Sequence, residues 1–76
     1  MNPPHAPATA FAKNDRIVAT TTTQGMTAGH SYTVVDLSIR HLLFGTFVSY
    51  QLQADDGGES FWVGNLHLLA TRISGA

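Results

Sequence analysis

The stretch GTFVSYQLQADDGGESFWV, residues 45–63, decides the fold that this sequence predicts. Its first half alternates between polar and apolar side chains, which places Val48, Tyr50 and Leu52 on one face of a strand. The Asp-Asp-Gly-Gly run at 55–58 tolerates the positive φ angles that a tight turn requires, so the chain should reverse there. The two halves of the stretch are therefore expected to pair as an antiparallel hairpin.

A second alternating stretch, SYTVVDLSI at residues 31–39, precedes this hairpin. Side chains at every second position of a strand share one face, so its odd-numbered residues should form a single apolar face. That face is expected to turn toward the core and carries Thr33, Val35, Leu37 and Ile39.

Shorter strands are expected at both ends of the ordered chain, over residues 16–20 and 70–73. Residues 65–69 are too few for a stable α-helix and should form a single helical turn. The sequence therefore predicts an all-β domain of five strands, with one helical turn before the last strand.

The first ten residues contain all three prolines, at positions 3, 4 and 7, and little that a core would bury. We expect residues 1–13 to be a flexible Pro/Ala-rich tail and residues 14–76 to be one small β-barrel domain. No run approaches the roughly 20 apolar residues of a membrane helix, and no secretory signal is recognisable. A cytoplasmic protein that does not contact membranes is the expectation.

This order of elements resembles that of the Src-homology-3-like small β-barrels over about residues 15–73. The strand at Ile17, the glycine-punctuated segment 25–34 and the hairpin tip at 55–58 carry the resemblance, together with the run 61–69. The acidic first loop and tandem tryptophans of the polyproline-binding members are missing, so that ligand is not implied. The resemblance implies a barrel, and closure is also expected on physical grounds, because an open sheet of five short strands would leave its edges exposed. The closed barrel is expected to enclose Val18, Val35, Leu37, Val48, Val63 and Leu68.

Composition and motifs give little support for chemistry. Cysteine is absent and charged residues make up 12% of the chain, with four Lys+Arg against five Asp+Glu. None of the four histidines has a partner at metal-ligand spacing, and no catalytic motif is present. No catalytic, cofactor-binding or metal-binding residue is predicted, and no cofactor.

Aromatic and apolar side chains exceed what a domain of this size can bury. By strand alternation Trp62 and Phe47 should lie on the outer face of the sheet. The segment 40–44 is expected to be a loop with an apolar run that either folds over an end of the barrel or docks on another chain. The predicted partner-binding residues are Trp62, Phe47, Leu42, Leu43 and Phe44.

The main hypothesis is a non-enzymatic interaction module that binds a protein partner or its own copies as a homo-oligomer, such as an accessory protein of a phage or mobile element. A single-stranded nucleic-acid-binding barrel is the second hypothesis, because aromatics are present although cations are few. The third is an oligomeric enzyme, because size, tail and barrel resemble type II dihydrofolate reductases. That family's Val-Gln-Ile-Tyr motif has no counterpart here, so no catalytic residue is transferred.

Overall fold

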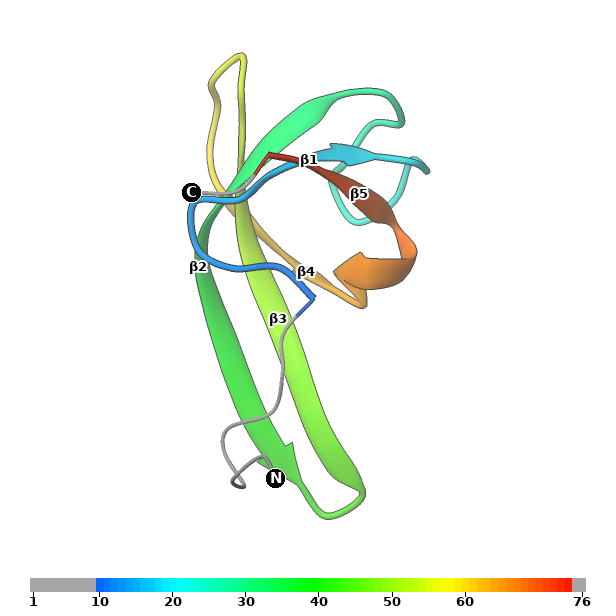
Figure 1. Ribbon diagram of the computed structural model, residues 1–76, viewed down its shortest axis with the longest axis vertical. Coiled ribbons are helices and arrows are strands. Elements are labelled where there is room, and N and C mark those ends of the chain that lie inside the picture. The colour runs from blue at the N-terminus through cyan, green and yellow to red at the C-terminus, as the bar shows by residue number, and fades with distance from the viewer. Residues whose placement is uncertain (1–9, 75–76) are drawn as a thin grey trace.

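The computed structural model describes residues 10–74 as one antiparallel sheet of five strands (Figure 1). The strands are β1 (Arg16–Ala19), β2 (Ser31–Leu42), β3 (Gly45–Ala54), β4 (Phe61–Gly64) and β5 (Ala70–Ser74). A single 3-10 turn, η1 (Leu66–Leu68), precedes the last strand. The all-β fold class expected from the sequence is confirmed. Within residues 10–74, no helix is long and apolar enough to cross a membrane.

The strand order in the sheet is β4-β3-β2-β1-β5, so the first and last strands lie side by side. The sheet curls, and η1 connects its two outermost strands, β4 and β5 (Figure 1). The pairing of β3 with β4 across the Asp-Asp-Gly-Gly segment confirms the predicted hairpin, and Gly57 and Gly58 there both have positive φ. Residues 1–9 of the predicted tail lie outside the described residues.

The strands of the β2–β3 hairpin are much longer than their neighbours β1 and β4, and the far end of the hairpin projects beyond the other strands (Figure 1). β2 has 12 residues and β3 has 10, whereas β1 and β4 have four each. The prediction of a loop over residues 40–44 is wrong, because pairing continues to Leu42 and Gly45. Only Leu43 and Phe44 remain as a two-residue turn.

A β-bulge at Val35 reverses the alternation that the sequence predicts for β2. Val34 pairs with Leu52 and Asp36 pairs with Gln51, which leaves Val35 as an extra residue. Before the bulge the even-numbered Tyr32 and Val34 are buried. After it, Leu37 packs against the core. The predicted single odd-numbered face is therefore wrong, because a bulge shifts the side-chain phase by one residue.

The core lies inside the curl of the sheet and draws on every strand. Its most deeply buried large side chains are Ile17, Met26, Leu52, Leu66, Val34 and Val63. Two residues predicted to be enclosed are not in this cluster, because Val18 has the opposite phase to Ile17 on β1 and Leu68 lies on the outside of η1. Leu37 and Val48 are partly buried against the core, while Val35 is partly exposed at the bulge.

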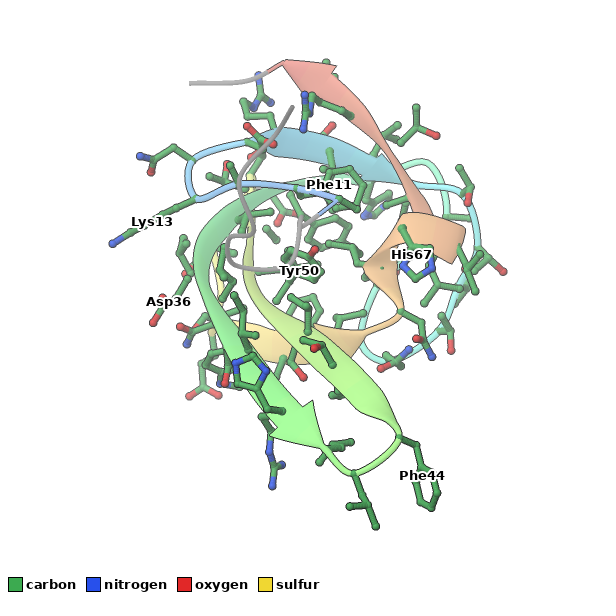
Figure 2. The ribbon with its side chains drawn as sticks, turned by 60° about the horizontal axis from the view of Figure 1, so that its bottom comes forward. Phe11, Lys13, Asp36, Phe44, Tyr50 and His67 are labelled. Atoms are coloured by element: carbon green, nitrogen blue, oxygen red, sulfur yellow. The ribbon has the colours of Figure 1, made fainter. Side chains whose placement is uncertain are left out.

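Phe11, which the sequence analysis places in the tail, belongs to the core. Its ring meets the edge of Tyr50 with centroids 5.8 Å apart, and the Tyr50 hydroxyl accepts a hydrogen bond from the backbone N–H of Ala10 at 3.1 Å. In Figure 2 Phe11 and Tyr50 lie together inside the curl. The packed part of the described chain therefore begins before Asn14.

Candidate binding surface

The tip of the β2–β3 hairpin is the most exposed apolar part of the described chain. Leu43 and Phe44 are 93% and 99% exposed, and Leu42 beside them is more than half exposed. Figure 2 shows Phe44 pointing away from the rest of the molecule. Neither turn residue has a positive φ, whereas Gly45, which follows the turn, has a φ of 143°. Both large side chains of the turn therefore lie in solvent.

The outer face of the sheet carries Phe47 and Trp62, as their alternation predicts. Trp62 is 49% exposed and Phe47 is 38% exposed. The ring of Phe47 covers Gly64, where a Cβ atom would come within 3.0 Å of Phe47 Cζ. Strand pairing places Trp62 opposite Gln51, so Phe47 and Trp62 share this face without being direct neighbours.

Arg40 lies on the same outer face as the two aromatic residues. It pairs with Phe47 across the hairpin, and together with Trp62, Ser38 and Ser49 it lines a shallow depression. The sequence analysis placed Arg40 in a loop and therefore gave it no position on the sheet. Once pairing continues past Ile39, alternation alone places Arg40 on the same face as Ser38.

Two of the four cationic side chains are bound in ion pairs at the other end of the sheet. Arg16 pairs with Asp55, and Arg72 pairs with the buried carboxylate of Asp15 at 3.0 Å. Asp15 also accepts a hydrogen bond from the backbone N–H of Ala12 at 2.8 Å. The predicted binding residues therefore have only Arg40 as a cationic neighbour in strand register.

A cleft of about 350 Å³ opens on the other side of the hairpin, where β3 extends past the end of β4. β4 ends because Asn65 takes a left-handed conformation, with φ 55° and ψ 35°, and turns the chain into η1. The cleft is lined by Ala10, Thr46, Phe47, Val48, Tyr50, Asn65 and His67. Of these only Phe47 was a predicted binding residue. The sequence does hold one indication of the cleft. The stretch that forms β3 is longer than the stretch that forms β4, so part of β3 has no β4 residue beside it.

Within residues 10–74, no group of three or more His, Asp or Glu side chains is placed to hold a metal ion. Among those residues, the tip, the outer face and the cleft at the β3 edge form the candidate binding surface, and each of the three includes residues of the β2–β3 hairpin. Comparison with family models, with curated proteins and with solved structures finds no match to this chain. The surface has to be interpreted from its own residues.

Proposed function

We propose that this protein is a non-enzymatic interaction module that binds a protein partner or a second copy of itself through the β2–β3 hairpin. The observation that carries the proposal is the pair Leu43 and Phe44, 93% and 99% exposed at a two-residue turn. Such turns favour Asn, Asp and Gly, and neither large apolar residue contributes to the fold in this position. Burying each side chain in an interface would be favourable by roughly 1.5–3 kcal/mol.

The outer face supports the same proposal. Trp62 and Phe47 are aromatic, partly exposed and held on paired strands, and aromatic residues with arginine are enriched at the centres of protein interfaces. Arg40 pairs with Phe47 and lines the same shallow depression as Trp62. Rigid strands limit the entropy that these side chains lose on binding.

The test begins with the solution mass of the full chain, measured by light scattering over about a thousandfold range of concentration. Leu43→Asp with Phe44→Asp should remove self-association, or the retention of a partner if the chain alone is a monomer. Ile73→Asp is the matched control, because Ile73 is 49% exposed on β5, which pairs with β1 at the other end of the sheet order. Equal binding by both variants would overturn the proposal.

Single-stranded nucleic acid is the second candidate ligand, favoured by the presence of Arg40 on the same outer face as Phe47 and Trp62. Bases stack on aromatic side chains while arginine neutralises phosphate, and such binding weakens steeply with salt. The pairing of Arg16 and Arg72 with carboxylates reduces the cationic groups that such a ligand would need. Fluorescence of Trp62, the only tryptophan, should change on addition of an oligonucleotide at low salt. No change would eliminate this candidate.

A further inference from the structure

The edge of β3 near the hairpin tip has backbone groups with no strand beside them. The two-residue turn makes Leu42 and Gly45 a hydrogen-bonded pair, so every second residue along β3 directs its N–H and C=O away from β2. Thr46 and Val48 are two such residues, and β4 pairs with β3 only from Ser49 to Leu52. Among residues 10–74, no hydrogen bond links another element to the backbone of Thr46 or Val48.

This edge lacks the features that usually prevent strands of different molecules from pairing. Proteins protect an exposed edge with charges, prolines or bulges, or cover it. β3 has no charged residue and no proline, and its segment from Gly45 to Gln51 pairs with β2 without a bulge. The neighbouring edges differ. Asp36 accepts the backbone N–H of Leu37 on β2, and the Gln24 amide bonds both the N–H and the C=O of Gly64 on β4.

Along the hairpin, the exposed Phe44 and the cleft at Val48 lie at equal distances in sequence from Thr46, on either side of it. Phe44 lies two residues before Thr46, and Val48, which lines the cleft, lies two residues after it. Ala10, Asn65 and His67, which lie outside the hairpin, also line the cleft. In Figure 2 His67 lies to the side of Tyr50, across the interior of the curl. A strand added along the edge of β3 would enter this cleft and stop at Gly64, where β4 begins to pair.

We infer that two copies of this chain associate by antiparallel pairing of their β3 edges about a two-fold axis at Thr46. In this register Thr46 faces Thr46 of the partner subunit as a hydrogen-bonded pair. The tip of each hairpin reaches the level of Val48 in the other, so Phe44 enters the cleft beside His67. The same patch serves both copies, so the assembly closes as a dimer and does not extend into a fibre.

The area of this interface approaches that of the smaller specific interfaces. Two buried Phe44 side chains contribute about 300–500 Å². The surface that they cover, both Leu43 side chains and the paired edges bring the total toward the about 1,200 Å² at which specific interfaces begin. No charged residue lies between Leu42 and Ala54, so the two strands meet without like-charge repulsion. The inference rests on the proposed function, because the hairpin tip is part of both.

Disulfide cross-linking tests the register directly, because the chain has no cysteine of its own. Thr46→Cys would place two cysteines in a hydrogen-bonded pair with Cα atoms about 5.5 Å apart, within the about 4.4–6.8 Å that a disulfide spans. The matched control is His41→Cys, since His41 pairs with Thr46 across the hairpin and is also exposed, on the opposite edge. Mild oxidation should link Thr46→Cys into a dimer and leave His41→Cys monomeric. Equal linking of both, or linking of neither, would overturn the inference.

Light scattering separates this inference from the proposed function. Thr46→Pro removes the N–H that the edge donates and should weaken dimerisation by at least about tenfold, the effect of losing two hydrogen bonds. His41→Pro makes the same change on the other edge and should leave the dimer intact. A dimer that is lost with Leu43→Asp and Phe44→Asp but unaffected by Thr46→Pro would overturn edge pairing while supporting the interaction module. A wild-type chain that stays monomeric at every concentration would overturn edge pairing, and the proposed function would then depend on a different protein partner.

Discussion

Gly25 and Gly29 lie in the same loop between β1 and β2 but have different surroundings. Both have positive φ, 95° and 86°, which an alanine adopts only with strain. A Cβ on Gly25 would lie 3.1 Å from the ring of Phe61, whereas a Cβ on Gly29 would meet nothing within 4 Å. We expect Gly29→Ala to destabilise the fold by about 1 kcal/mol through backbone strain alone, and Gly25→Ala by about 1–2 kcal/mol more. Urea unfolding of both variants measures the difference, and equal losses would contradict the packing argument.

Asp15 is the only buried charged residue among those described, and its carboxylate has two partners. It accepts from the backbone N–H of Ala12 at 2.8 Å and pairs with Arg72 at 3.0 Å. Asp15→Ala removes the acceptor of the Ala12 N–H and the ion pair with Arg72, whose half-exposed guanidinium keeps its hydrogen bond to the Ala10 carbonyl. The free energy of unfolding should therefore fall by about 1–2 kcal/mol. Asp36→Ala is the control, because Asp36 is exposed and bonds only the next backbone N–H, so its loss should stay within about 0.5 kcal/mol. Chemical denaturation that ranks the two in the opposite order would refute this assignment.

At the scale of elements, the bulge at Val35 determines which side chains of β2 face inward. Deleting Val35 leaves the pairing of Val34 with Leu52 and of Asp36 with Gln51 in a regular register, so the inward face is kept. We expect this deletion to fold cooperatively with a loss of about 1–2 kcal/mol. Deleting Ser38 instead reverses the phase of Ile39 against Val48 and should disrupt the hairpin. Circular dichroism during thermal unfolding checks both, and a cooperative transition in the Ser38 deletion would contradict the expected loss of register.

At the scale of the whole molecule, the folded unit includes the segment before β1. Phe11 is 6% exposed and packs on Tyr50, so a chain that begins at Asn14 leaves a cavity over the core. Phe→Ala changes in a core cost about 3–5 kcal/mol, a large part of the stability of a domain of this size. A chain starting at Asn14 should therefore be largely unfolded near room temperature. Phe11→Ala in the full chain should show most of the same loss, and an unchanged melting temperature in either variant would contradict this role of Phe11.

The fold class and several parts of the candidate site could be predicted because they depend on local chemistry. Alternation placed Val48, Tyr50 and Leu52 on the inner face of β3, and Phe47 and Trp62 on the outer face of the sheet. The Asp-Asp-Gly-Gly run marked the turn before β4, and the brevity of residues 65–69 marked η1. Each of these features is set by residues within a few positions of one another along the chain.

The phase of β2, the length of the hairpin and the cleft depended on tertiary structure. Val35 is an extra residue only because Val34 and Asp36 have fixed partners on β3, and no property of Val35 itself indicates this. Pairing in the hairpin continues to Leu42 and Gly45 although β4 ends at Gly64, and this inequality opens the cleft and leaves the edge of β3 unpaired. Sequence by itself determined which side chains are apolar and how they alternate. Which of them meet, and which backbone groups stay without a partner, was decided by long-range strand pairing, because register depends on residues far apart along the chain.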